Sequence, residues 1–186
     1  MSAEVISSEL KYHGWAHFMV AEIRLPDGEI IRREIEDHGT AVAVLAYDPL
    51  RKTAILVSQF RAPVFIGTGE TQMLEVIAGI QEEPDPSDTA RREAHEEAGL
   101  KLQSIEFVAR TWTMPGISTE RISLYLATYE HSPQGNSPGP PFEEGITAVE
   151  LTLTKLDKMM ENGLIIDMKT LVLLQALKLQ HRDLFA

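Results

Sequence analysis

Three glutamates in the middle of the chain have the spacing of one helix face. Glu93, Glu96 and Glu97 lie three and four positions apart within residues 79–100, GIQEEPDPSDTARREAHEEAGL. At about 100° per residue, their side chains would fall within an arc of roughly 100° on a helix. Like charges at this spacing cost about 0.2–0.5 kcal/mol per pair, and the helix dipole disfavours negative charge in the last turn. Stability alone therefore does not explain the cluster.

Two explanations for the clustered glutamates are open. A divalent cation would offset their repulsion, and magnesium binds carboxylate and carbonyl oxygens together with water and substrate phosphates. Alternatively, the cluster is a solvated, salt-bridged face, because Arg92 can pair with Glu96 at i+4. The first explanation indicates chemistry on phosphates, and the second indicates a purely structural role.

The local sequence predicts that residues 86–98 form the helix that carries these glutamates. Asp85 can cap its start, Pro86 suits the first helical position, and Gly99 can end it in a left-handed conformation. Small side chains recur at every fourth position: Ala90, Ala94 and Ala98. This stripe would let one face of the helix lie very close to a sheet.

Strands are predicted on both sides of this helix. Upstream, a hairpin is expected from residues 17–25 and 29–37 around a Pro-Asp-Gly turn, followed by strands at 40–47, 53–60 and 73–78, with glycines at 67 and 69 as an interruption. Downstream strands are expected at 105–113, 121–129 and 148–153. Residues 131–145 are too rich in Pro and Gly for regular structure, which indicates a loop.

Two further helices are predicted near the end of the chain. Thr154 and Asp157 resemble a capping box, with Asn162-Gly163 as the stop. The last helix starts after Asp167 and turns three leucines to the core: Leu171, Leu174 and Leu177. Strands before and after the central helix indicate an α/β fold with a mixed sheet and helices on its faces, and the early hairpin would be an addition to it.

Composition limits the compartments and partners. The 186 residues are 44% hydrophobic and 24% charged, which is ordinary for a globular domain. With 28 acidic and 17 basic residues and a formal charge of -11, binding to nucleic acid or a membrane surface is not expected. Without cysteine, any metal must be bound by oxygen or imidazole. The N-terminus has no signal-peptide pattern and no apolar run is long enough to span a bilayer, so we expect a cytoplasmic protein.

Residues 79–100 resemble the Nudix box. In that box a glycine is followed by five residues, a glutamate and seven further residues, and then by the run R-E-U-x-E-E-x-G-U, in which U is an apolar residue. The matching positions are Gly79, Arg92, Glu93, Ala94, Glu96, Glu97, Gly99 and Leu100. Asp85 stands where the first glutamate is expected, and it is one residue too close to Arg92. Either Glu83 takes that acidic role, or Asp85 only caps the helix.

Two later segments are similar to the branch of the Nudix family that hydrolyses nucleoside diphosphate sugars, the GDP-mannose and ADP-ribose pyrophosphatases. They are MPGISTE at 114–120, which contains Pro115 and Glu120, and GLIIDMKT at 163–170. The resemblance implies a Nudix α/β/α sandwich over residues 39–186. It also implies an N-terminal antiparallel β-sheet extension over residues 1–38, for dimerisation and nucleotide contact.

The resemblance also implies the reaction and the residues that perform it. The expected activity is Mg²⁺-dependent hydrolysis, with Mn²⁺ as a possible substitute, of a nucleoside diphosphate sugar to a nucleoside monophosphate and a sugar phosphate. Glu93 and Glu97 would bind metal, with Glu96 acting directly or through water and the Ala78 carbonyl completing the site. The expected general base is Glu144 or its neighbour Glu143 at the end of the Pro/Gly-rich loop, unless both are merely solvated.

Substrate contacts are expected from several places in the chain. The candidates are Trp15, Arg32, Arg33, Glu34, Arg61, Glu75, Pro115 and Glu120. Trp15 would stack on a base or serve only as an apolar anchor, and Arg61 would bind phosphate or simply end a strand. Glu75, alone among apolar neighbours, needs either Arg92 or a metal as its partner. Arg92 is expected to hold Glu75 or a carboxylate of the box.

Other outcomes remain open at this point. The family implies a homodimer in which the N-terminal strands reach the partner subunit. ADP-ribose and GDP-mannose cannot be separated as substrates from the sequence. Alternatives are a different Nudix substrate, such as a nucleoside triphosphate or a dinucleoside polyphosphate, and a non-catalytic sensor of nucleotide sugars.

Overall fold

The computed structural model describes residues 2–129 and 145–186. The chain divides into two compact units. One is built from Met1–Ala41 with Arg110–Ile122, and the other from Val42–Ala109 with Ser123–Ala186. No helix in the described part of the chain is long and apolar enough to cross a membrane.

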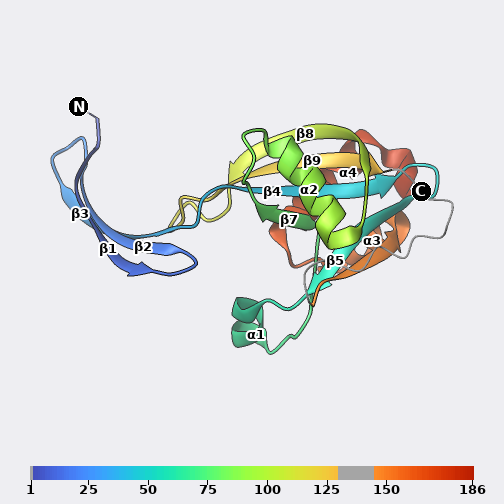
Figure 1. Cartoon of the computed structure of the whole chain (residues 1–186), viewed down its shortest axis with the longest axis horizontal. Coiled ribbons are helices and arrows are strands. Elements are labelled where there is room, and N and C mark those ends of the chain that lie inside the picture. Colours follow the sequence, from blue (N-terminus) through green and yellow to red (C-terminus); the bar gives the residue numbers. More distant parts are fainter. Residues whose placement is uncertain (1, 130–144) are drawn as a thin grey trace. The chain divides into compact units, whose positions relative to one another are not determined.

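The first unit contains an antiparallel sheet of three strands in the order β1-β2-β3 (Figure 1). The strands are β1 (Glu4–His13), β2 (His17–Arg24) and β3 (Ile30–Asp37). The predicted hairpin is confirmed as β2 and β3, with Gly28 in its turn at φ 93°. The antiparallel N-terminal sheet implied by the family resemblance is confirmed, but β1 was not predicted as a strand of its own. All ten of its residues are exposed, so no alternation between buried and exposed positions marks it in the sequence.

A mixed sheet of seven strands forms the core of the fold, in the order β10-β5-β4-β9-β8, with β6 on β5 and β7 on β4. Its strands are β4 (Ala41–Asp48), β5 (Thr53–Gln59), β6 (Met73–Glu75), β7 (Ile77–Ile80), β8 (Leu102–Trp112), β9 (Arg121–Tyr129) and β10 (Thr147–Thr152). The strand predicted at 73–78 is in fact two short strands that pair with different neighbours. The chain therefore changes sheet partner immediately before the box helix.

The helices are α1 (Ala62–Thr68), α2 (Pro86–Ala98), α3 (Leu153–Glu161) and α4 (Met168–Gln180), followed by a short 3-10 helix, Arg182–Phe185. α2 covers one face of the sheet, and α3 and α4 cover the other, whereas α1 has no buried residue (Figure 1). The alanine stripe of α2 packs in one apolar cluster with Val42 and Val44 of β4. Ala43 and Leu45 are equally buried and point to the opposite face, where Figure 1 shows α3 and α4.

Two helix predictions need correction, one helix was missed, and the predicted range of the box helix is confirmed. α2 spans 86–98 as expected. α3 starts earlier than predicted, because the Thr152 hydroxyl, not Thr154, caps it by accepting from Lys155 N at 3.2 Å. In α4, Leu173 is fully buried and Leu171 only partly. α1 was not predicted, since its glycines indicated an interruption; one of them, Gly69, ends the helix at φ 81°.

Candidate active site

The ends of α2 fix the orientation of its glutamates. Asp85 accepts a hydrogen bond from Ser87 N at 2.8 Å and so caps the first turn. At the other end Gly99 adopts φ 64°, and its N–H donates to the His95 carbonyl at 2.8 Å. Asp85 is therefore the helix cap, which was one of the two roles expected for it.

Two of the box glutamates lie buried beside β7. Glu93 and Glu97, one turn apart on α2, are only 6% and 3% exposed. The backbone N–H of Ala78 donates to Oε2 of Glu97 at 3.2 Å. Gly79 leaves room for Glu93, since a Cβ built at this glycine would overlap the Glu93 carboxylate. The close approach allowed by the alanine stripe thus brings both carboxylates against the β7 backbone.

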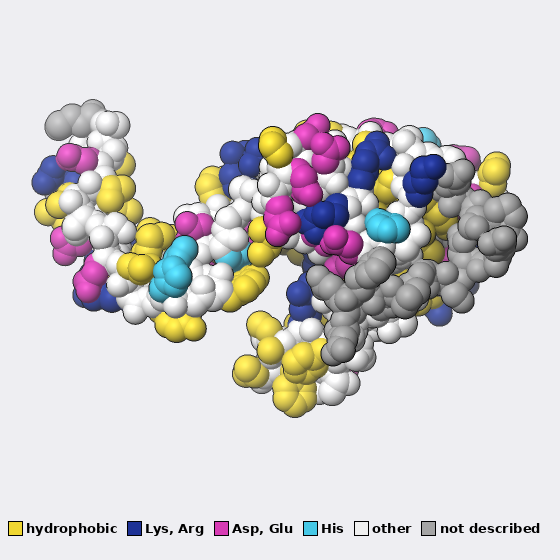
Figure 2. Space-filling model, viewed as in Figure 1, with side chains coloured by type: hydrophobic (Ala, Val, Ile, Leu, Met, Phe, Trp, Pro, Cys, Tyr) yellow, Lys and Arg dark blue, Asp and Glu magenta, His cyan; other side chains and the backbone are white. Residues whose placement is uncertain are grey.

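Arg92 is the centre of a cluster of carboxylates. Its guanidinium lies 2.8 Å from Glu93 and 2.5 Å from Glu96, and it also pairs with Glu83 at 3.0 Å and Glu82 at 3.4 Å. Burial alone would lower the pKa of Arg92, but the charge of Glu93 and the bonds to Glu83 and Glu96 outweigh it and raise the pKa above its ordinary value. Acidic side chains gather over α2, with basic ones among them (Figure 2). Arg92 therefore holds box carboxylates, and the upstream acids that reach it are Glu82 and Glu83, not Asp85.

The carboxylates of α2 have the donor chemistry of a divalent-cation site. Within residues 2–129 and 145–186, no three His, Asp or Glu side chains are gathered closely enough to hold a metal by themselves. Glu93 and Glu97 nevertheless offer carboxylate oxygens next to the β7 backbone, in space that a side chain at position 79 would fill. Oxygen donors of this kind fit Mg²⁺, which takes few protein ligands and completes its shell with water or substrate phosphates. Glu143 and Glu144, the expected general bases, lie outside the described residues.

The partners of Glu75 differ from the expected ones. This carboxylate, 2% exposed, accepts bonds from Arg61 Nε at 2.7 Å and Nη2 at 3.1 Å, and also from Lys169 Nζ. The predicted pairing of Glu75 with Arg92 is therefore wrong. Burial would raise the pKa of Glu75, but the Arg61 bonds and the Lys169 charge outweigh burial and hold it below its ordinary value.

Lys169 was not among the predicted site residues, and the start of α4 explains its position. Asp167 caps α4 and accepts from Thr170 N at 3.0 Å and from Lys169 Nζ at 2.9 Å. The Thr170 hydroxyl in turn accepts from Val76 N at 2.8 Å, between β6 and β7. These bonds tie α4 to the strands beside α2 and direct Lys169 toward Glu75. The only sequence signal for Lys169 was its place in the GLIIDMKT segment.

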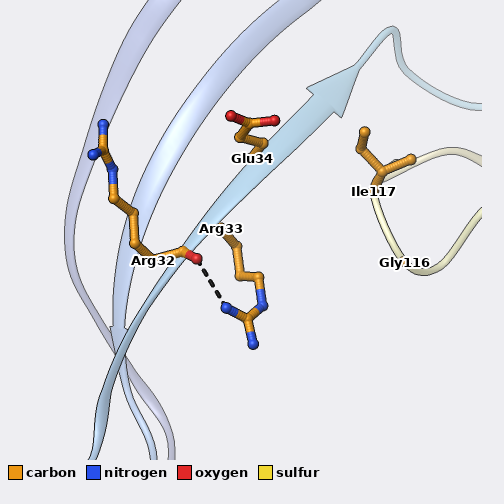
Figure 3. A pocket seen from close by; sticks show the side chains of 5 residues that line it. All are labelled: Arg32, Arg33, Glu34, Gly116 and Ile117. Atoms are coloured by element: carbon orange, nitrogen blue, oxygen red, sulfur yellow. Dashed lines mark hydrogen bonds between the residues drawn. The ribbon is translucent and has the colours of Figure 1, made fainter.

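A pocket of about 490 Å³ lies within the first unit. Its lining consists of Arg32, Arg33, Glu34, Gly116 and Ile117. Figure 3 shows the two arginine side chains leaving opposite sides of β3, with Arg33 donating to the Arg32 carbonyl at 2.9 Å. The structure thus brings the predicted substrate contacts Arg32, Arg33 and Glu34 together with the turn that follows Pro115.

Trp15 and Glu120, two other predicted substrate contacts, meet at one histidine. The indole of Trp15 is stacked on the His38 ring, with centroids 5.0 Å apart. Glu120 Oε2 lies 3.2 Å from Nδ1 of the same ring. His38 was not predicted as a site residue, because its neighbours in the sequence form no recognisable motif. It becomes notable only once the fold brings residues 15, 38 and 120 together.

Comparison with known proteins gives consistent results. The family profile described as "NUDIX domain" matches residues 37–171. A GDP-mannose pyrophosphatase of Cronobacter sakazakii is 34% identical over 157 residues, covering 83% of this chain and 82% of that protein. One of Pectobacterium atrosepticum is 33% identical over 177 residues, covering 92% of each. A structure titled "Crystal structure of ADP compounds hydrolase" superposes with a TM-score of 0.76 at 16% identity, over 98% of this chain and 96% of the other, and so supports the fold alone.

Proposed function

The chain belongs to the Nudix hydrolase family, and on that premise we propose that it hydrolyses the pyrophosphate bond of a nucleoside diphosphate sugar. GDP-mannose is the first candidate, since both relatives compared above match most of the chain and are GDP-mannose pyrophosphatases. ADP-ribose is the second candidate. The observation that carries the proposal is the buried pair Glu93 and Glu97 beside the β7 backbone.

The proposed reaction adds one water across the P–O–P bridge. The water oxygen forms a new bond to one phosphorus, the bridging P–O bond breaks, and the products are a nucleoside monophosphate and a sugar phosphate. The negative phosphate oxygens repel an incoming nucleophile, so the protein must neutralise charge and orient both phosphates.

Glu93 and Glu97 are the proposed ligands of a divalent cation, Mg²⁺ or Mn²⁺, with Glu96 and the Ala78 carbonyl as further donors. When bound, such a cation supplies positive charge to phosphate oxygens and lowers the pKa of a coordinated water. Arg92 keeps the neighbouring carboxylates in place when no cation is present, because it pairs with Glu93 and Glu96. The fixed helix ends then hold the glutamates in one orientation.

Arg61 is the proposed phosphate contact of the protein itself. Its Nε and Nη2 are bound to Glu75, which leaves Nη1 outside this pair on a side chain that is 41% exposed. Glu75 and Lys169 fix the guanidinium before a substrate arrives. A pre-oriented arginine loses less side-chain entropy on binding phosphate than a free one does.

Recognition of the nucleoside is proposed for the first unit. The Arg32–Glu34 triplet lines a pocket with both donors and an acceptor for a base or ribose, and Pro115 belongs to the turn that forms its other wall. Trp15 offers an exposed ring for stacking, and Glu120 an additional acceptor. The proton of the attacking water would pass to Glu144 or Glu143.

A homodimer belongs to the proposal, as does a cytosolic location. β1 carries exposed apolar side chains, Val5, Leu10 and Tyr12, on a strand without a single buried residue. A second copy of the chain would remove such a surface from water. Light scattering on the purified protein should give twice the mass of the chain, and the mass of a single chain would reject the dimer.

Product analysis tests the proposed function. Purified protein with Mg²⁺ is offered GDP-mannose, ADP-ribose, other sugar nucleotides, nucleoside triphosphates and dinucleoside polyphosphates in parallel. We expect GMP with mannose 1-phosphate, or AMP with ribose 5-phosphate, as the main products. Preferred cleavage of a triphosphate or dinucleoside polyphosphate would reject the substrate class. Saturable binding without turnover would reject the enzyme and leave a sensor.

A further inference from the structure

We propose that His38 is a positioning residue for the proposed nucleoside pocket of the first unit, and that it sets the Trp15 ring and the turn 114–120 in place for substrate. This inference rests on the proposed function. It assigns no chemistry to His38 itself. The claim is that a single ring fixes two groups which would otherwise have to be ordered by the ligand.

The first observation is that both ring nitrogens of His38 face carboxylates. Nε2 lies 3.0 Å from Oε1 of Glu36, and Nδ1 lies 3.2 Å from Oε2 of Glu120. An ionised carboxylate accepts hydrogen bonds, so whichever ring nitrogen carries a proton has an acceptor within reach. The side chain is 13% exposed, so water competes little for these contacts.

The second observation is where those two carboxylates lie. Glu36 is near the end of β3, and Glu120 closes the turn before β9. The backbones of the same two segments are joined by bonds from Glu36 N to Ile117 O at 2.9 Å and from Thr119 N to Glu36 O at 3.0 Å. These segments form the two walls of the pocket, Arg32–Glu34 on one side and Gly116 with Ile117 on the other. His38 therefore links the side chains of both walls.

The third observation is the stacking of Trp15 on this ring. The two rings are 5.0 Å apart with an interplanar angle of 26°, while Trp15 remains 76% exposed. A free indole on a hairpin turn would lose rotamer freedom when it stacks on a base, and this loss would weaken binding. A ring that is already held by His38 avoids most of that cost. Stacking of an aromatic ring on a nucleobase strengthens binding enough for the difference in affinity to be measured.

Asp37 also links the end of β3 to the turn 114–120, but it does not take the place of His38. Its Oδ1 accepts from Thr119 Oγ1 at 2.7 Å and from Gly39 N at 3.2 Å. These bonds join β3 to the turn but do not reach Trp15 or Glu120. Loss of His38 should consequently loosen Trp15 and Glu120 while the strand–turn junction and the fold persist.

Fluorescence of a single tryptophan tests the link to Trp15. The chain has two tryptophans, so a Trp112→Phe background leaves Trp15 as the only emitter. In that background we expect His38→Ala to lower the anisotropy of Trp15, and His38→Phe to retain it because an aromatic ring remains beneath the indole. Unchanged anisotropy in folded His38→Ala would overturn the proposal. This measurement needs no substrate, so it stands even if no sugar nucleotide is hydrolysed.

Kinetics and ligand binding test the consequence for substrate. With GDP-mannose, or ADP-ribose if that is the better substrate, His38→Ala should raise KM about 10-fold or more, the scale of one lost stacking contact, with little change in kcat. His38→Phe should raise KM less. If His38→Ala does not fold, His38→Phe takes its place in this test. His181→Ala is the matched control, since His181 also lies beside an aromatic ring, Tyr47 at 6.2 Å, in the other unit. A fall in kcat with KM unchanged, or an equal effect of His181→Ala, would overturn the proposal.

Discussion

Arg61 donates two hydrogen bonds to the Glu75 carboxylate, from Nε at 2.7 Å and from Nη2 at 3.1 Å. The carboxylate is almost fully buried, and Lys169 binds it from α4. A buried ion pair adds little stability compared with apolar residues of similar size, but loss of the Glu75 charge leaves Arg61 without its carboxylate partner, while Lys169 keeps Asp167. The relationship between Arg61 and Glu75 therefore sets both the stability of the site and the orientation of its proposed phosphate contact.

Glu75→Gln should destabilise the protein by about 1–3 kcal/mol, because Arg61 and Lys169 lose a buried counter-charge, although Lys169 keeps Asp167. Urea denaturation at pH 7 gives the free energy of unfolding. Glu161→Gln makes the same chemical change at an exposed position on α3 and should have almost no effect. Similar unfolding curves for the two variants would show that the network does not stabilise the fold.

The acid stability of the protein should also depend on Glu75. Its pKa in the folded chain lies below the ordinary value of 4.5, so the folded state binds this proton more weakly than the unfolded state does. The resulting stability is present above the ordinary pKa and is lost as the pH falls through the folded pKa. Unfolding free energies measured from pH 6 downward should decline less steeply in Glu75→Gln than in the wild type. Parallel curves would contradict the assignment.

Asp85 and Glu83 should behave differently, although both precede the box helix. Asp85→Ala removes the helix cap and should lower the melting temperature, with kcat/KM unchanged. Glu83→Gln keeps the cap but weakens the pair with Arg92, so it should alter activity more than Asp85→Ala does. Thermal melts and kinetics on both variants check this difference. A large loss of activity in Asp85→Ala alone would make Asp85 the functional acid of the box.

Gly79→Ala should weaken metal binding, because the added methyl group would overlap the Glu93 carboxylate and displace it from β7. The expected result is a smaller rise in melting temperature on addition of Mg²⁺ than the wild type shows. Gly67→Ala in α1 is the matched control, since nothing lies within 4 Å of its added Cβ. If both variants respond to Mg²⁺ as the wild type does, the space at Gly79 is not part of a metal site.

The sequence predicted those parts of the fold that depend on local signals. The range of α2 followed from Asp85, Pro86 and Gly99, all adjacent to the helix they delimit. The hairpin of β2 and β3 followed from its turn. β1 could not be found in the same way, because a fully exposed strand has no buried face to impose a pattern on its residues.

The contacts of the site depend on residues that are distant in the sequence, and the sequence predicted them less well. Glu75 was correctly singled out as a charge that needs a partner, but its partners Arg61 and Lys169 are 14 and 94 positions away. Arg92, one of the two partners expected for Glu75, is bound instead to the carboxylates of α2. The junction of Trp15, His38 and Glu120 is likewise created by folding, and no spacing in the chain indicates it.

The most direct test of the account is kcat/KM for GDP-mannose with saturating Mg²⁺, compared between the wild type, Glu97→Gln and Glu161→Gln. We expect Mg²⁺-dependent release of GMP and mannose 1-phosphate that is abolished by chelation, kept by Glu161→Gln, and reduced roughly 100-fold or more by Glu97→Gln through the loss of a ligand to a catalytic cation. ADP-ribose replaces GDP-mannose if product analysis favours it. Undiminished hydrolysis by folded Glu97→Gln would contradict the claim that the buried carboxylates of α2 form the catalytic metal site.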